Sequence, residues 1–130
     1  LMTIANGESK ITETIFENRM NHIYLLNEMG ASIKLNKNVA HIKGVKTING
    51  MNLVGSDLRS SAALIIAGII AKGSSNFYGL EHLDRGYENF ELKLKNLGVK
   101  IIREISKNSS EENDYKVEPK SENFSKLEVA

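Results

Sequence analysis

Three arginines and one aspartate are the residues of this sequence best suited to binding an anion. Arg59 stands two residues after Asp57 at the start of an apolar run, and Arg19 and Arg85 occur in matching surroundings 66 residues apart. A guanidinium group grips a phosphate or a carboxylate through two parallel hydrogen bonds. The helix macrodipole disfavours a cation at a helix start unless an anion lies there, so arginines at predicted helix starts indicate an anion site.

Each arginine also has a simpler explanation, an ion pair with a neighbouring acid. Arg59 is close to Asp57 in the sequence, and Arg85 directly follows Asp84. For an isolated arginine we favour this structural explanation, because most paired charges are structural. The recurrence of an arginine at one offset moves the balance toward a shared anion site.

Arg19 and Arg85 belong to an internal repeat. Residues 4–7 (Ile-Ala-Asn-Gly) match residues 70–73 (Ile-Ala-Lys-Gly) at an offset of 66, and residues 26–33 match residues 94–101 at an offset of 68. A two-residue insertion therefore separates the arginine from the next shared glycine in the second copy. A repeat of this kind predicts a domain built from equivalent units. The two copies span about residues 1–44 and 45–105, which together form one partial domain.

The same elements are predicted in each copy, in the order strand, helix, strand. The first strands are expected at residues 9–14 and 76–80, the helices after Arg19 and Arg85, and the next strands at residues 31–35 and 99–105. Gly30 and Gly98 end the helices. In the second helix an apolar stripe and an ion pair between Glu91 and Lys95 are expected; the stripe consists of Tyr87, Phe90, Leu94 and Leu97.

The segment between the copies predicts a hairpin followed by a buried helix. Asn-Lys-Asn at 36–38 is a turn signal before a strand at 39–42. Ser56 or Asp57 is placed to cap a helix from residue 58 to about 72, and residues 62–71 of this helix carry no charge. By the repeat, residues 1–6 are expected to be the last turns of an equivalent helix. Its beginning is missing, so the chain is expected to be a fragment.

Composition excludes several classes of function. The sequence has no cysteine and a net charge of +1, which argues against a thiolate site, a cysteine nucleophile and a nucleic-acid footprint. His22, His41 and His82 are not at ligand spacing, so we expect no metal site. No leader or spanning segment is apparent, which makes the cytoplasm the expected location. Residues 106–130 are polar and are expected to form a mostly disordered tail.

Three motifs carry a resemblance to a known family. They are Thr-Glu-Thr-Ile-Phe-Glu-Asn-Arg-Met at 12–20, Ser-Asp-Leu-Arg-Ser-Ser-Ala at 56–62 and His-Leu-Asp-Arg-Gly-Tyr-Glu at 82–88. With Met-Gly-Ala at 29–31, they make residues 1 to about 105 resemble the enolpyruvyl transferases, and in particular those that act on a nucleotide sugar. The resemblance implies an α/β (α+β) fold, an inside-out α/β barrel of repeated βαβαββ units, with only part of one domain present.

The resemblance also implies a reaction. In it, phosphoenolpyruvate gives its enolpyruvyl group to the 3-hydroxyl of UDP-N-acetylglucosamine and phosphate is released, without a cofactor, as the first committed step of peptidoglycan synthesis. Such a step serves the bacterial cell wall, and through it cell shape and division. The family's cysteine loop, its lysine-asparagine pair and its hydroxyl-activating aspartate do not occur here. This chain alone is therefore expected to be inactive and to need the missing N-terminal part of the same enzyme.

Site residues follow from the resemblance. Arg59 and Arg85 match arginines that hold the carboxylate and phosphate of phosphoenolpyruvate, and Arg19 matches a third arginine of the same cleft. Asp57 matches an acid beside them, expected to orient a group or handle a proton. Ile15 and Leu58 complete the expected substrate-binding set. Two alternatives stay open: a shikimate-pathway enolpyruvyl transferase, and a non-catalytic anion-binding module.

Overall fold

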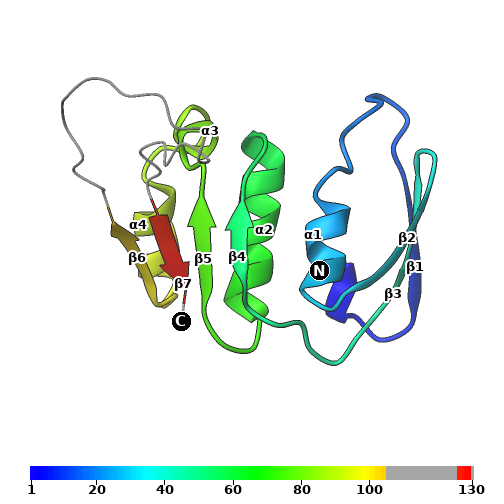
Figure 1. Cartoon of the computed structure of the whole chain (residues 1–130), viewed down its shortest axis with the longest axis horizontal. Coiled ribbons are helices and arrows are strands. Elements are labelled where there is room, and N and C mark those ends of the chain that lie inside the picture. Colours follow the sequence, from blue (N-terminus) through cyan, green and yellow to red (C-terminus); the bar gives the residue numbers. More distant parts are fainter. Residues whose placement is uncertain (105–125, 130) are drawn as a thin grey trace, which may run out of the picture.

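The computed structural model describes residues 1–104 and 126–129. Helices and strands alternate along the chain (Figure 1). The elements are η1 (Met2–Ile4), β1 (Glu8–Thr12), α1 (Ile23–Glu28), β2 (Ser32–Asn36), β3 (Val39–Lys43), β4 (Asn52–Val54), α2 (Leu58–Ile70), β5 (Ser75–Tyr78), α3 (Glu81–Asp84), α4 (Phe90–Asn96), β6 (Ile101–Glu104) and β7 (Lys126–Val129). None of the helices in these residues is long and apolar enough to cross a membrane.

The first sheet has three antiparallel strands in the order β1-β3-β2. The predicted hairpin is confirmed: β2 and β3 pair from Ser32 with Lys43 to Asn36 with Val39. Lys37 adopts a left-handed backbone with φ of 55° at the turn. Because α1 packs on β2, the inward faces of the sheet and of α1 bury a small apolar cluster; its members are Ile23, Ile33, Ala40 and Ile42.

The second sheet has four strands in the order β4-β5-β7-β6. β4 and β5 are parallel, whereas β7 is antiparallel to both of its neighbours. The prediction of a tail without structure is therefore wrong for residues 126–129, which form β7. Lys-Leu-Glu-Val alternates polar and apolar residues, as a half-buried strand does, and Val129 is 2% exposed. The rest of the predicted tail, residues 105–125 and 130, lies outside the described residues.

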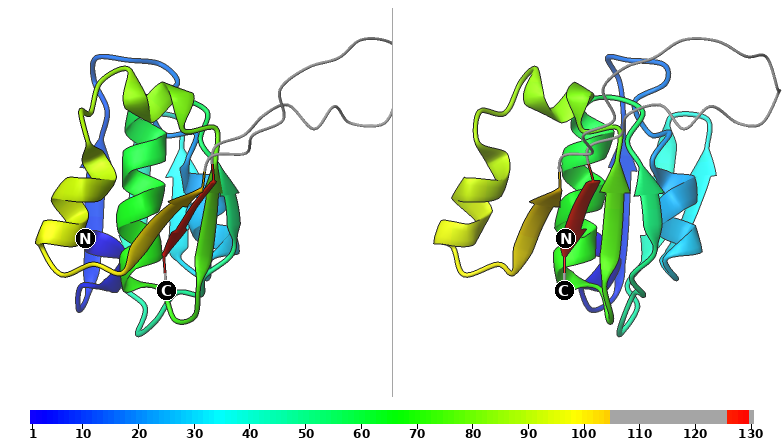
Figure 2. Two further views of the ribbon diagram at one scale, coloured as in Figure 1. Left: turned by 90° about the vertical axis from the view of Figure 1, so that its left-hand side faces the viewer. Right: turned by 60° about the vertical axis from the view of Figure 1, so that its left-hand side comes forward.

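Helix α2 packs on the second sheet and contacts α1 (Figure 2). Gly68 makes the close approach to β5 possible, because a Cβ there would lie 2.5 Å from Cζ of Phe77. The apolar run is only partly buried, in contrast to the prediction. Leu64 and Ile65 are fully buried, whereas Ile66 is 51% exposed on the other face of the helix.

The internal repeat is visible in the backbone. Ala71 ends α2 with φ and ψ of −74° and 151°, and Ala5 ends η1 with −73° and 147°. Gly73 and Gly7 then both adopt positive φ, at 90° and 101°. Residues 2–4 are thus one 3₁₀ turn at the position where the repeat predicts the end of a helix.

The second helix of the repeat differs from its prediction. A short helix, α3, precedes Arg85, and α4 begins only at Phe90. Phe90 packs on the core, but Leu97 is 80% exposed and so does not belong to a buried stripe. Glu91 contacts Arg103 of β6 and not Lys95, because β6 brings a guanidinium group within its reach.

Candidate functional site

The three arginines predicted to bind an anion all belong to segments at one end of the molecule. Arg19 lies in the loop after β1, Arg59 in the first turn of α2, and Arg85 directly after α3. In Figure 1 these three segments lie together along the upper end. Because β4 and β5 are parallel, the segments that follow them meet at the same edge of the sheet.

Asp57 caps α2 and is one of the two caps that the sequence predicts. One of its carboxylate oxygens accepts hydrogen bonds from the backbone N–H groups of Arg59, at 2.9 Å, and of Ser60, at 3.0 Å. The hydroxyl of Ser60 accepts from the Asp57 backbone N–H at 3.1 Å, which completes a capping box. Desolvation acts to raise the pKa of Asp57, but the bonds from Ser60 and Arg59 outweigh it and lower this pKa.

The capping role of Asp57 tests the simple explanation for Arg59, an ion pair with Asp57. The carboxylate of Asp57 is directed at backbone N–H groups, and within the described residues the Arg59 guanidinium has no ion pair. The simple explanation, a pair with Asp57, is therefore wrong. Arg59 is an exposed cation at the start of a 13-residue helix, a placement that the macrodipole disfavours and that a bound anion stabilises.

Phe16 connects Arg59 with Arg19. The Arg19 guanidinium carbon lies 3.9 Å from the centroid of the Phe16 ring, and that of Arg59 lies 6.0 Å from the same centroid. Two cations thus share one aromatic ring, which holds them close together despite their like charge. The loop after β1 and the start of α2 are joined at this point.

Glu13 organises the loop that carries Arg19. One of its carboxylate oxygens accepts from the backbone N–H groups of Ile15, at 2.8 Å, and Phe16, at 3.3 Å, and the other lies 3.5 Å from Arg19. The backbone bond from Ile15 is the main cause of a lowered pKa for Glu13. Asn38 of the hairpin turn donates to the Glu13 carbonyl at 2.7 Å and so fixes the loop to the sheet.

Arg85 lies before a helix as predicted, since α4 follows from Phe90, but it is also the C-terminal cap of the four-residue helix α3. The dipole argument for an anion therefore applies to Arg59 alone. A Cβ on the next residue, Gly86, would lie 2.6 Å from a methyl carbon of Leu58, which directly precedes Arg59.

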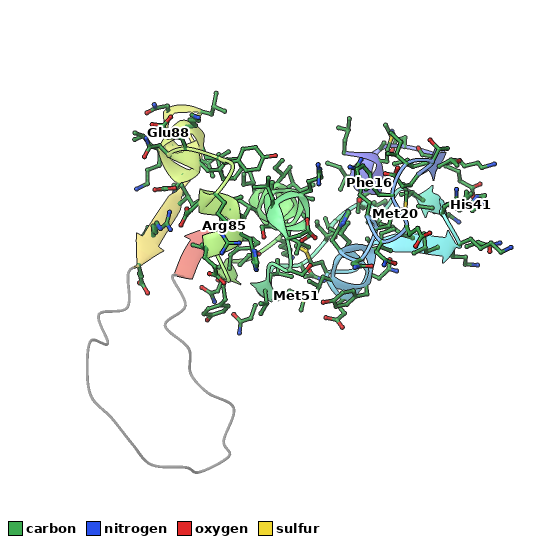
Figure 3. All side chains as sticks on the ribbon, turned by 90° about the horizontal axis from the view of Figure 1, so that it is seen from above. Phe16, Met20, His41, Met51, Arg85 and Glu88 are labelled. Atoms are coloured by element: carbon green, nitrogen blue, oxygen red, sulfur yellow. The ribbon has the colours of Figure 1, made fainter. Side chains whose placement is uncertain are left out.

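This contact between Gly86 and Leu58 brings the neighbours of Arg85 and Arg59 together. Viewed from above, Arg85 and Phe16 lie on opposite sides of α2 (Figure 3). The segments that carry the three arginines therefore lie around the start of α2.

The simple explanation for Arg85 is wrong as well. Asp84 does not pair with Arg85 but with Arg103 of β6, whose two terminal nitrogens donate to its two carboxylate oxygens at 2.9 and 2.5 Å. Arg103 also reaches Glu91 of α4 at 3.5 Å. Its hydrogen bonds to Asp84 are the main cause of a raised pKa for Arg103.

Two expected substrate-binding residues have distinct surroundings. Ile15 is 76% exposed beside Phe16, an unusual exposure for an isoleucine. Leu58 is half-buried against Gly86, and its visible role is packing.

Sequence reasoning missed three residues that organise the site: Glu13, Phe16 and Arg103. Glu13 carries a local signal, because an acid two residues before exposed backbone N–H groups is typical of a capped turn. Phe16 and Arg103 carry none, since their contacts join segments that are far apart in the chain.

An apolar hollow of about 560 Å³ lies beside Arg19. Ile11, Ile66 and Ile70 are among its lining residues, together with Glu13, Arg19 and His22. Burial lowers the pKa of His22, whose Nδ1 has no hydrogen-bond partner among the described residues. In the described part of the chain, no group of three histidine, aspartate or glutamate side chains is placed to hold a metal ion.

Comparison with known proteins identifies relatives of the whole chain. Residues 1–94 match the family described as EPSP synthase (3-phosphoshikimate 1-carboxyvinyltransferase). A UDP-N-acetylglucosamine 1-carboxyvinyltransferase of Prochlorococcus marinus strain AS9601 is 94% identical over all of this chain and 28% of its own length. One of the same name from Trichormus variabilis is 48% identical over 79% of this chain and 23% of its own length. The chain thus spans about a quarter of these relatives.

Solved structures agree with this grouping. The enolpyruvyl transferase NikO from Streptomyces tendae superposes with a TM-score of 0.66 and 28% identity, over 72% of this chain and 22% of that one. An EPSP synthase from Acinetobacter baumannii gives a TM-score of 0.59 over 97% of this chain and 26% of that one, and at 18% identity it shows the fold alone. The predicted fold class, part of an α/β enolpyruvyl transferase domain, is confirmed.

Proposed function

The chain belongs to the EPSP synthase (3-phosphoshikimate 1-carboxyvinyltransferase) family, and on that premise we propose that it forms part of a UDP-N-acetylglucosamine 1-carboxyvinyltransferase. The complete enzyme transfers the enolpyruvyl group of phosphoenolpyruvate to the 3-hydroxyl of UDP-N-acetylglucosamine. The observation that carries the proposal is the gathering of three arginines, none held by its sequence-adjacent acid, around the start of α2. The names of the near-identical relatives favour the nucleotide sugar over shikimate 3-phosphate.

The chemistry suits fixed cations. The sugar hydroxyl adds to C2 of phosphoenolpyruvate, C3 gains a proton, and a tetrahedral intermediate forms. The intermediate then loses phosphate by cleavage of the C2–O bond, and C3 returns a proton. Both substrates are anions, so guanidinium groups that are already in place orient them and stabilise the charge that shifts onto the departing phosphate.

We assign Arg59 and Arg85 to the carboxylate and phosphate of phosphoenolpyruvate and Arg19 to the same anionic region. Two observations support the assignment of Arg59 and Arg85: both side chains are exposed, and neither has an ion pair within the described residues. Asp57, held as an ionised cap, is suited to orienting Arg59 more than to donating a proton. Ile15 is assigned to the side of the nucleotide sugar, and Leu58 to substrate binding.

The rest of the enzyme supplies what this chain lacks. The apolar hollow and the exposed Leu1, Ile66 and Ile70 support a buried interface with the remaining part of the same polypeptide. We propose that this part provides the opposite wall of the cleft and that domain closure excludes water. The setting that follows is cell-wall synthesis in the cytoplasm, where phosphoenolpyruvate is available.

A substrate comparison tests the proposal. A full-length enzyme is made by placing this chain in the matching segment of a complete carboxyvinyltransferase, and phosphate release is measured with UDP-N-acetylglucosamine or shikimate 3-phosphate as acceptor. We expect turnover with the first acceptor alone. Turnover only with the second establishes the shikimate-pathway alternative.

The Arg59→Ala variant of the same enzyme separates catalysis from simple anion binding. We expect a loss of about a thousandfold in kcat/KM with unchanged folding. Near-normal turnover rejects the site assignment, and a folded wild-type protein without turnover on either acceptor favours the non-catalytic module.

A further inference from the structure

Arg103 is the most highly connected cation of the described structure. Its guanidinium makes a two-point contact with Asp84, at the end of α3, and a longer contact with Glu91 of α4. One side chain of β6 thus ties down both helices that flank Arg85. Paired, two-point contacts of this kind fix direction as well as distance.

The backbone around Arg85 is held on both sides of this contact. Leu83 is fully buried, and its carbonyl accepts from the N–H groups of Gly86 and Tyr87 at 3.1 and 2.9 Å. Asp84 lies between Leu83 and Arg85 and is anchored by Arg103. The Arg85 side chain is exposed and has no ion pair in the described residues.

The contact between Arg103 and Asp84 also affects whether the Arg85 guanidinium is available to bind an anion. Asp84 is adjacent in sequence to Arg85, and a free carboxylate there competes with any anion for the Arg85 guanidinium. Because both oxygens of Asp84 accept hydrogen bonds from Arg103, this competition is weakened. Arg103 pairs with the acid and so leaves the neighbouring Arg85 guanidinium available to a ligand.

We propose that Arg103 is a positioning residue for phosphoenolpyruvate binding, which it supports by sequestering Asp84 and fixing the turn that presents Arg85. This inference rests on the proposed function, in which Arg85 binds phosphoenolpyruvate. It predicts that loss of Arg103 is felt at the phosphoenolpyruvate side of the reaction, although Arg103 does not contact substrate.

The test compares Arg103→Met with Lys100→Met in the full-length enzyme. Both variants remove one positive charge, but Lys100 is exposed and has no ion pair in the described residues. For Arg103→Met we expect the KM for phosphoenolpyruvate to rise by about tenfold or more, with the KM for UDP-N-acetylglucosamine changed less than about threefold. Equal effects on both KM values, or none, overturn the proposal.

A second variant separates sequestration from a merely structural role. Adding Asp84→Asn to Arg103→Met removes the competing charge, so we expect the double variant to recover most of the lost affinity for phosphoenolpyruvate. No recovery contradicts sequestration. If Arg103→Met does not fold, Arg103→Lys with and without Asp84→Asn serves for the same comparison, since lysine keeps the charge but loses the two-point contact.

A structural measurement distinguishes this inference from the proposed function. In a crystal structure of the Arg103→Met enzyme, we expect the Asp84 carboxylate to pair with Arg85. That outcome supports sequestration whichever acceptor the enzyme uses, and a carboxylate that stays away from Arg85 refutes it. An active Arg85→Ala enzyme, in contrast, refutes the substrate role of Arg85 and leaves the pairing result standing.

Discussion

The two copies of the repeat use the same scaffold and treat their arginines differently. In each, a strand leads through an arginine-bearing loop to a helix and then to two antiparallel strands, with orders β1-β3-β2 and β5-β7-β6. In the first copy Arg19 is held by Glu13 and by the Phe16 ring. In the second, Arg85 is left without a partner in the described residues, because Arg103 takes its neighbouring acid.

The difference indicates that the repeat determines the position of each arginine, whereas the surrounding contacts determine whether its guanidinium is available to bind a ligand. Arg19 lies close to a carboxylate and to an aromatic face, so part of its interaction capacity is already used within the loop. Arg85 has no such partner in the described residues, so its guanidinium is available to a ligand. The two arginines are therefore expected to contribute unequally to an anion site.

The largest expected effect separates Arg85 from Arg19. Arg85→Ala in the full-length enzyme is expected to lower kcat/KM about a thousandfold, because it removes one of the two cations that we propose to bind phosphoenolpyruvate. Arg19→Ala is expected to cost about tenfold, since its charge is already shared with Glu13. Steady-state kinetics measure both, with circular dichroism as the folding control. Equal losses remove the proposed distinction between the copies.

The next effect concerns the approach of α2 to β5. Gly68 corresponds to Met2 at the repeat offset, so only the second copy requires a glycine there. Gly68→Ala places a Cβ 2.5 Å from Cζ of Phe77 and 3.2 Å from Cβ of Ser75, and we expect it to reduce the free energy of unfolding by about 2 to 3 kcal/mol. Urea unfolding of the full-length enzyme measures it.

Gly86→Ala is the matched control for this substitution. Its Cβ meets only the end of the Leu58 side chain, which is able to move, so a smaller loss is expected. A loss at Gly86 as large as that at Gly68 contradicts the interpretation.

A smaller effect tests whether β7 lies between two strands of the second sheet, as β3 does in the first. Val129 is 2% exposed and pairs with Ser75 on one side and Ile101 on the other. Val129→Ala is expected to destabilise the protein by about 1.5 kcal/mol through loss of two buried methyl groups. Amide exchange provides a second measurement, with slow exchange expected for residues 126–129. Fast exchange there contradicts β7 and agrees with the predicted disordered tail.

The smallest effect is the pH dependence of His22. Burial lowers its pKa below 6.5 in the folded protein, so the unfolded chain binds more protons as the pH falls through this region. Stability is therefore expected to decrease from about pH 7.5 to pH 5.5. Asp57 and Glu13, whose pKa values are also lowered, add to this loss only at more acidic pH.

His22→Gln isolates the histidine contribution in urea unfolding across this range. Glutamine does not titrate, so the variant is expected to show a flatter profile. An unchanged slope assigns the dependence to other groups.

Much of the fold was predictable because its signals are local. The turn at 36–38 gave the hairpin, the residue order around Asp57 gave the helix cap, and glycines at equal spacing gave the repeat. Apolar periodicity was less reliable at the surface. Leu97 fits the stripe of a helix, but the helix ends before it can be buried.

The candidate site was predictable only in its residue types. The three arginines and Asp57 were found by repetition and by resemblance, but their partners were not. Asp84 and Arg103 belong to different elements, and no spacing rule favours that pair over Asp84 with Arg85. The position of Arg85 at a helix end was missed because four-residue α3 is too short to carry a periodic signal.

The position of β7 has a consequence for how the molecule assembles. β5 and β6 are not hydrogen-bonded to each other, and β7, which the ribosome makes only after residue 125, lies between them. Until it arrives, both strands offer unpaired backbone to any other chain nearby. In the first sheet β2 pairs with β3 through a two-residue turn, and β1 pairs with β3 from Thr12 to Val39. The second sheet needs a contact of longer range, Phe77 with Leu127, which slows folding. Completion of the second sheet is thus the step of synthesis most exposed to misassembly.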